Sequence, residues 1–182
     1  MPSVFLTKSS PHALLVLNDL MEQFLKNLLR FETIIAGVFY TIAAAILFAD
    51  VISREVFAQP IWGGQRIAVL LANAAALIGI AVAVALHRHI RPSLLDKAVP
   101  SQFLPLLLKV GNLVSAVVMF FGAYYGAILV LDNKMMGFTT PPLDLEIWIP
   151  MLALPYGLAS AGLRYLIFAI QPELQPQEQE II

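Results

Sequence analysis

The sequence predicts an all-α integral membrane protein with four transmembrane helices preceded by an amphipathic interfacial helix. Of its 182 residues, 59% are hydrophobic and only 13% are charged, whereas soluble domains average roughly 45–50% apolar and about 25% charged residues. The mean hydropathy is +0.81. Residues 67–86 run for twenty positions without a charged side chain, and about 20 helical residues cross a bilayer core of about 30 Å.

The first 31 residues are predicted to form a tail and the amphipathic interfacial helix. Ser10 and Pro11 are typical of a helix start, with serine as the N-cap and proline at the first helical position. From His12 to Arg30, apolar residues recur at helical spacing and polar residues fill the other face. Such a helix lies in the membrane interface, and packing against the soluble surface of a partner is the alternative.

Residues 32–170 are predicted to form one four-helix transmembrane domain, with spans at about 33–49, 67–86, 110–131 and 147–170. Proline and glycine residues between the first two spans predict a loop there. Trp62 in this loop suits the aromatic belt of a membrane interface. The tail, residues 171–182, is acidic and rich in glutamine, which predicts disorder.

Lysine and arginine residues are unevenly divided between the two sides of the predicted spans. Three of the eleven, Arg54, Arg66 and Lys134, fall on one side. The other eight are Lys8, Lys26, Arg30, Arg88, Arg91, Lys97, Lys109 and Arg164. Because cytoplasmic loops carry the excess of positive charge, both termini are expected in the cytoplasm, and the loops with Trp62 and Pro141 face outward.

The composition excludes several classes of function. The chain has no cysteine and therefore no disulfide or thiolate metal site. His87 and His89 have no carboxylate beside them to complete a metal site, and no histidine lies within a span to hold a haem. The net charge of −1 does not suggest a nucleic-acid partner. We therefore expect neither an enzyme nor a cofactor.

Ionisable side chains lie near the edges of the predicted spans rather than well inside them. These edge residues are Glu32, Asp50, Arg66 and Arg164, of which Arg164 is expected to snorkel to the interface. Because ion-coupled transport usually needs a charged group in the membrane, the chain is not expected to transport a solute alone. Small and amide residues predict helix packing instead, at Asn73, Gly79, Asn112, Gly122 and Gly126.

The order of these signals resembles a known family over about residues 20–170. It comprises an amphipathic entry helix, Glu32, Asp50-Val-Ile-Ser-Arg54, Pro60-Ile-Trp62, Gly79, His89-Ile-Arg91, Asp96, and Pro155-Tyr-Gly157 with Arg164. Together they resemble the small permease subunit, of the DctQ or SiaQ type, of tripartite ATP-independent periplasmic (TRAP) transporters. Two places depart from that pattern: Gly63-Gly64-Gln65-Arg66 lacks an acidic residue that often follows the loop tryptophan, and Pro92-Ser93 stands where an acidic or branched residue is common.

The resemblance implies partners rather than a reaction. A large membrane subunit would hold the substrate and sodium sites and move like an elevator, while this subunit anchors the static scaffold in the bacterial inner membrane. A periplasmic substrate-binding protein would deliver an organic acid of the C4-dicarboxylate or sialic acid type. Residues expected to help dock it on the outer face are Arg54, Glu55, Trp62, Arg66, Lys134, Asp144 and Glu146.

Membrane lipids are a further expected partner. The residues expected to hold lipid headgroups or the interface are Lys26, Arg30, Arg88, His89, Arg91 and Lys97. Two other functions stay open at this point. One is a membrane-anchor subunit of a redox enzyme complex, and the other is a small oligomeric exporter, for which Glu32 would have to sit deep in the membrane.

Overall fold

The structure is a computed structural model that describes residues 11–86, 104–141 and 143–174. Its order is α1 (Pro11–Phe57), α2 (Gly64–Ala85), α4 (Leu104–Met136), β1 (Thr139–Thr140), β2 (Leu145–Glu146), α5 (Trp148–Met151), α6 (Ala153–Ile170) and η2 (Pro172–Leu174). Within these ranges, four segments are long and apolar enough to cross a membrane: Asn18–Phe57, Gly64–Ala85, Leu106–Met136 and Trp148–Ile170. The all-α membrane fold is thereby confirmed.

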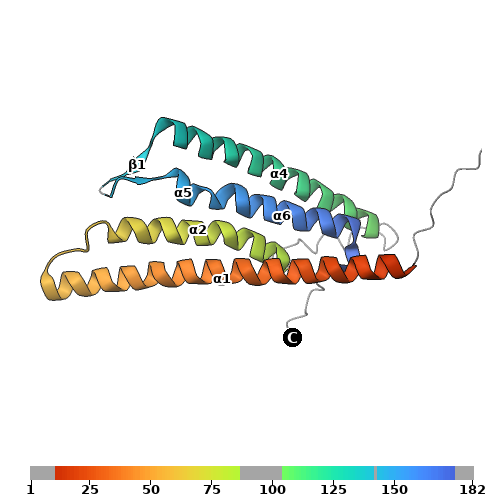
Figure 1. Cartoon of the computed structure of the whole chain (residues 1–182), viewed down its shortest axis with the longest axis horizontal. Coiled ribbons are helices and arrows are strands. Elements are labelled where there is room, and N and C mark those ends of the chain that lie inside the picture. The colour runs from red at the N-terminus through yellow and green to blue at the C-terminus, as the bar shows by residue number, and fades with distance from the viewer. Residues whose placement is uncertain (1–10, 87–103, 142, 175–182) are drawn as a thin grey trace, which may run out of the picture.

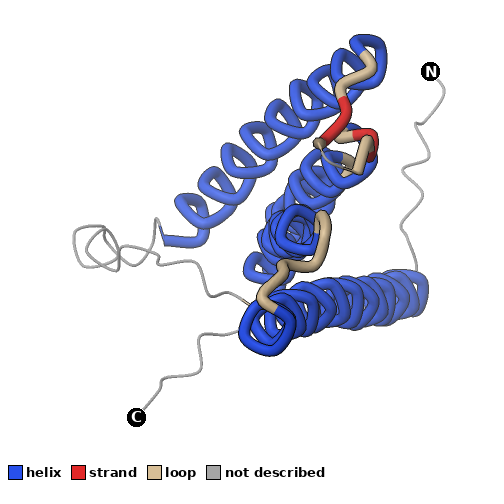
Figure 2. The backbone as a smooth tube through the Cα atoms, turned by 90° about the vertical axis from the view of Figure 1, so that its left-hand side faces the viewer, coloured by secondary structure: helices blue, strands red, loops and turns tan. Residues whose placement is uncertain are grey.

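The four long helices form a row rather than a closed bundle. α1 packs on α2, α2 packs on α6, and α6 packs on α4. Figures 1 and 2 show α1 and α4 on opposite sides of the α2–α6 pair. Because each outer helix has one main neighbour, many large apolar side chains remain exposed, among them Phe48 on α1 and Phe121 on α4. A row of this kind leaves two broad faces for lipid or for a partner.

α1 is one continuous helix of 47 residues. The segment predicted as an interfacial helix and the first span are consecutive parts of it, because Phe31 and Glu32 join them without a proline or glycine to break the helix. At 1.5 Å per residue the helix is about 70 Å long, more than twice the thickness of a bilayer core. α1 therefore extends well beyond a single membrane span.

The turn between α1 and α2 is fixed by one carboxylate and one glycine. Asp50 Oδ1 accepts a hydrogen bond from the backbone N–H of Ile61 at 2.8 Å, and Asp50 Oδ2 pairs with Arg54 Nη2 at 2.6 Å. Gly63, with φ of 72°, precedes the first residue of α2. A Cβ at Gly63 would lie 2.5 Å from Leu143 in the hairpin loop. The left-handed backbone and the close neighbour both favour glycine here.

α4 ends at the same end of the molecule, where a short hairpin leads into α5. Gly137, with φ of 63°, follows the helix in the left-handed conformation typical of helix ends. β1 and β2 pair antiparallel, with Thr139 opposite Glu146. The helix is then interrupted at Leu152, because Pro155 has no N–H to bond the carbonyl four residues earlier. The segment predicted as one fourth span is thus divided into α5 and α6.

The ends of the chain differ from the predicted bounds in one respect. Gln171 is predicted to start a disordered tail, but Pro172–Leu174 forms a 3₁₀ turn, and Gln171 Nε2 donates to Asn18 Oδ1 at 2.7 Å. This contact ties the beginning of α1 to the end of α6. Residues 1–10 and 175–182, predicted as tails, lie outside the described residues.

Candidate functional site

A buried polar cluster joins α1 to α6. Glu32 of α1 is 0% exposed and Arg164 of α6 is 1% exposed, and Arg164 Nη2 lies 2.6 Å from Glu32 Oε2. Ser160 donates to Glu32 Oε1, and Tyr156 Oη donates to the same oxygen at 3.3 Å. We call these four residues the Glu32 cluster.

The spacing of the residues on α6 explains how they meet one carboxylate. Tyr156, Ser160 and Arg164 recur every four residues and so share one face of the helix. Arg164 Nη1 also donates to Ser160 Oγ at 2.7 Å, while the buried Arg164 Nε has no hydrogen-bond partner among the described residues. The Glu32 carboxylate therefore accepts hydrogen bonds from two hydroxyl groups and faces one guanidinium that balances its charge, so the cluster connects the two helices.

Sequence reasoning placed Glu32 and Arg164 near membrane edges, and the structure places both inside the protein. Arg164 does not snorkel to an interface, because its guanidinium points at Glu32 and is buried. One sequence signal could have paired them: a charged side chain beside an apolar span requires a partner of opposite charge. Their separation of 132 residues hides this pairing from any local pattern.

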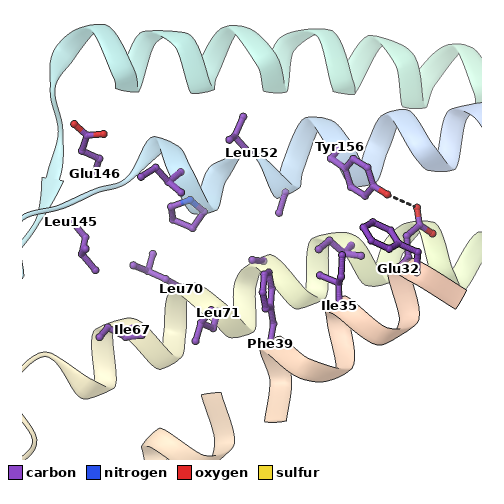
Figure 3. Close-up of a pocket in the computed structure, with 16 residues that line it drawn as sticks. Glu32, Ile35, Phe39, Ile67, Leu70, Leu71, Leu145, Glu146, Leu152 and Tyr156 are labelled. Carbon is purple, nitrogen blue, oxygen red and sulfur yellow. Dashed lines mark hydrogen bonds between the residues drawn. The ribbon is translucent and has the colours of Figure 1, made fainter. Parts of the chain in front are cut away.

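An apolar groove of about 560 Å³ runs from the Glu32 cluster toward the hairpin. α2 supplies the floor with Ile67, Leu71, Ala74 and Ile78, and α1 and α5–α6 form the walls. Figure 3 shows Tyr156 and Glu32 at one end of the groove, with Leu145 and Glu146 at the other. Its lining suits hydrocarbon chains or apolar side chains.

A second pocket, of about 540 Å³, opens at the turn between α1 and α2. It brings together three of the residues predicted to dock a binding protein: Arg54, Trp62 and Arg66. Trp62 is 68% exposed, and Arg66 has no ion pair among the described residues. Pro141 of the hairpin loop completes the wall. We call this the arginine pocket; because Arg54 is paired with Asp50, it is the positive charge of Arg66 that favours an anionic partner.

The other predicted docking residues lie at the same end of the molecule but outside the arginine pocket. Lys134 Nζ lies 4.7 Å from the centre of the Trp148 ring, and Trp148 Nε1 donates to Glu146 at 2.6 Å. Asp144 occupies a left-handed turn position with φ of 50°, and Glu55 is exposed on α1. The hairpin residues therefore form a separate patch beside the pocket.

The predicted packing residues fall into two groups. A Cβ at Gly122 or Gly126 of α4 would lie 3.2–3.3 Å from leucine side chains of α6, and Asn112 is buried. Asn73 is exposed on α2, and a Cβ at Gly79 would meet open space. A role in helix packing stays a prediction for this second group.

Gly157 of α6 is a packing residue that sequence reasoning did not assign. A Cβ there would lie 2.2 Å from the backbone oxygen of Leu77 in α2. Only glycine allows such a close approach of two helices. Its place in a Pro-Tyr-Gly run was visible in the sequence, but the run does not show which helix approaches it.

The lipid-anchor predictions are only partly located by the structure. Lys26 pairs with Glu22 on the exposed side of α1, and Arg30 is exposed on the same helix. Arg88, His89, Arg91 and Lys97 lie outside the described residues. Among the residues that are described, no group of three His, Cys, Asp or Glu side chains could hold a metal ion.

Comparisons with known proteins show which family the sequence resembles. The model of the family described as "Tripartite ATP-independent periplasmic transporters, DctQ component" matches residues 43–173, from the second half of α1 into η2. The ectoine TRAP transporter small permease protein TeaB of Halomonas elongata is 30% identical over 142 residues. That alignment covers 78% of this chain and 74% of TeaB.

Proposed function

The chain belongs to the DctQ-component family of tripartite ATP-independent periplasmic transporters, and we propose that it is the static membrane scaffold for a large permease subunit. Membership of this family makes it a transporter component and not an enzyme. It is a membrane protein with four apolar helices. The family relationship does not favour a redox anchor or an independent exporter.

The observation that carries the scaffold role is the Glu32 cluster within the open row of helices. The buried ion pair links α1 to α6 of the same chain, and α2 lies between these two helices. A static wall must keep its helices in fixed register while another subunit slides along it. Charge-assisted hydrogen bonds between helices supply such a constraint.

The arginine pocket supports a role in docking the periplasmic binding protein. Two guanidinium groups and an exposed tryptophan line one opening at one end of the molecule. Charge complementarity of this kind raises the rate at which an acidic partner finds its site. In this proposal that end faces the periplasm and both termini are cytoplasmic, in agreement with the positive-inside rule.

Substrate and sodium recognition are assigned in this proposal to the large subunit and the binding protein. The name of the relative TeaB specifies ectoine, so ectoine joins C4-dicarboxylates and sialic acids as solutes to test. Lys26 and Arg30 of α1 are proposed to hold anionic lipid headgroups near the cytoplasmic side.

The decisive experiment is purification of the tagged chain, expressed with its neighbouring genes, followed by reconstitution. We expect a large multi-span membrane protein at about equal amount, and solute uptake in vesicles only with both subunits, the binding protein and a sodium gradient. Uptake by vesicles that contain the large subunit and binding protein without this chain would contradict the scaffold role. Purification of the chain alone as a homo-oligomer would also contradict it.

A further inference from the structure

We propose that the face of α2 around Asn73 is where a membrane-spanning helix of the large subunit docks, through a side chain that hydrogen-bonds the Asn73 amide. This inference rests on the proposed function, because it requires the large subunit. The inference specifies which of the two faces of the row of helices contacts the large subunit. It also specifies which side chains the contacting helix must have.

The first observation is the depth of an exposed amide. Asn73 is the tenth of the 22 residues of α2, so it lies about 13 Å from the start of the helix and about 18 Å from its end. That is close to the middle of the bilayer core. Asn73 is exposed and has no hydrogen-bond partner among the described residues. The hydrocarbon core of the bilayer offers no hydrogen-bonding group, so an unpaired amide in it raises the free energy of the protein.

The second observation is the shape of the surface around Asn73. Val69 and Ala76 lie four residues before and three after it, and both are exposed, so the three share one face. A Cβ at Gly79, one turn beyond Ala76, would meet open space. Small residues beside a polar one let a second helix approach closely enough to hydrogen-bond.

The third observation is that this face is distinct from the apolar groove and continues into the arginine pocket. The groove is lined on α2 by Ile67, Leu70, Leu71, Ala74 and Ile78. At about 100° per residue, four of these point about 100–160° around the helix from Asn73, and only Leu70, three residues before Asn73, borders its face. Val69 and Arg66, by contrast, line the arginine pocket. The same face therefore offers an amide at mid-depth and borders, at its outer end, the arginine pocket proposed to dock the binding protein.

The Asn73 amide and the small residues beside it determine which side chains the docking helix must have. The docking helix carries a hydrogen-bonding side chain such as Ser, Thr, Asn or Gln at mid-depth, with small or apolar residues around it. A lipid molecule offers hydrogen-bonding groups only at the headgroup level and cannot satisfy the amide of Asn73.

Site-specific photo-crosslinking tests the proposal directly. Benzoylphenylalanine is placed at position 69 or 76, and at Ile34 as a control. Gly64 approaches Ile46 of α1, so Asn73 is level with residue 37 in the antiparallel pair, close to Ile34. Ile34 is 58% exposed and by helical periodicity points away from α2. After illumination of the purified complex, we expect adducts with the large subunit from positions 69 and 76 and none from Ile34.

A second measurement uses the amide itself. N73L should reduce the amount of large subunit that co-purifies after a stringent detergent wash by several-fold, while the thermal stability of the isolated chain stays unchanged. T41V is the matched control, because Thr41 is exposed on α1 and already bonds the backbone oxygen of Gly37 at 2.8 Å. We expect T41V to leave co-purification unchanged.

The outcomes separate the two proposals. If the unmodified chain does not co-purify with a large membrane subunit, the proposed function fails. If the complex forms but positions 69 and 76 give no adduct with it, or if only Ile34 does, the Asn73 face is overturned and the function stands. Unchanged co-purification of N73L would overturn the hydrogen bond even where adducts form.

Discussion

Glu32 and Arg164 lie 132 residues apart in the sequence and meet as a buried ion pair, with 2.6 Å between Arg164 Nη2 and Glu32 Oε2. The pair connects α1 with α6 although α2 lies between them in the row of helices. Glu32 and Tyr156 also close one end of the apolar groove (Figure 3). One polar contact therefore fixes both the spacing of the helices and the shape of the groove.

Removal of one partner of this pair should be severely destabilising. R164M leaves the carboxylate of Glu32 buried without its cation, and breaking a buried pair in this way costs about 3–5 kcal/mol. We expect a large drop in the midpoint of thermal unfolding of the purified chain in mild detergent.

The double variant separates the pair from the rest of the packing. E32L combined with R164M should be more stable than R164M alone, because no uncompensated charge remains. K26A serves as the control: Lys26 and Glu22 form an exposed pair, and such pairs contribute little. If the unfolding midpoint fell equally in R164M and in the double variant, the ion pair would not be important for stability.

The sequence was sufficient to predict the spans but not their arrangement. Long apolar runs identify membrane helices because length and hydropathy are local properties, and α2 begins and ends within three residues of its predicted bounds. The continuity of α1 was not predicted, because an amphipathic segment followed by an apolar segment is typical of two separate helices. The row of helices depends on contacts such as Gly157 with Leu77, and no periodicity encodes these.

The candidate site was predictable to the same limited degree. Arg54, Trp62 and Arg66 were selected because they lie in one outward loop, and the arginine pocket does gather them. The Glu32 cluster was not assembled, because Tyr156, Ser160 and Arg164 are individually unremarkable on a membrane helix. Only the fold shows that one face of α6 meets the carboxylate of α1.

The close approach of α6 to α2 should make Gly157 intolerant of any side chain. A Cβ would lie 2.2 Å from the backbone oxygen of Leu77, so G157A must push the helices apart, at a cost of about 1–3 kcal/mol. G111A is the matched control, since a Cβ at Gly111 of α4 meets open space and alanine favours helix. We expect G157A alone to lower the unfolding midpoint, and a neutral G157A would refute the close contact.

Gly63 should be constrained both by its backbone and by its neighbour. G63A forces alanine into a left-handed conformation, at about 1–2 kcal/mol, and brings its Cβ to 2.5 Å from Leu143. G137A tests the backbone effect alone, because Gly137 also has positive φ but no neighbour within 4 Å. Thermal unfolding should show G63A as the more damaging variant, and adding L143A to G63A should restore part of the loss.

Asp50 should hold the turn between α1 and α2 closed. D50N keeps an oxygen that can accept the Ile61 N–H but loses the ion pair with Arg54, whereas D50A loses both contacts. A lost hydrogen bond of this kind is worth about 1 kcal/mol. Limited proteolysis should therefore cut residues 58–63 several-fold faster in D50A than in D50N. Equal rates would show that the ion pair, and not the acceptor, holds the turn.

Reversal of charge in the arginine pocket should weaken docking of the binding protein without harming the fold. Arg66 is exposed and has no ion pair among the described residues, so R66E should leave the unfolding midpoint unchanged. In vesicles with all three components, we expect R66E to raise the concentration of binding protein needed for half-maximal uptake by several-fold, with the largest effect at low salt. K26E is the control, because Lys26 lies on α1 far along the chain from this turn and pairs with Glu22. If R66E and K26E shift the curve equally, or if the shift does not depend on salt, electrostatic docking at this pocket is wrong.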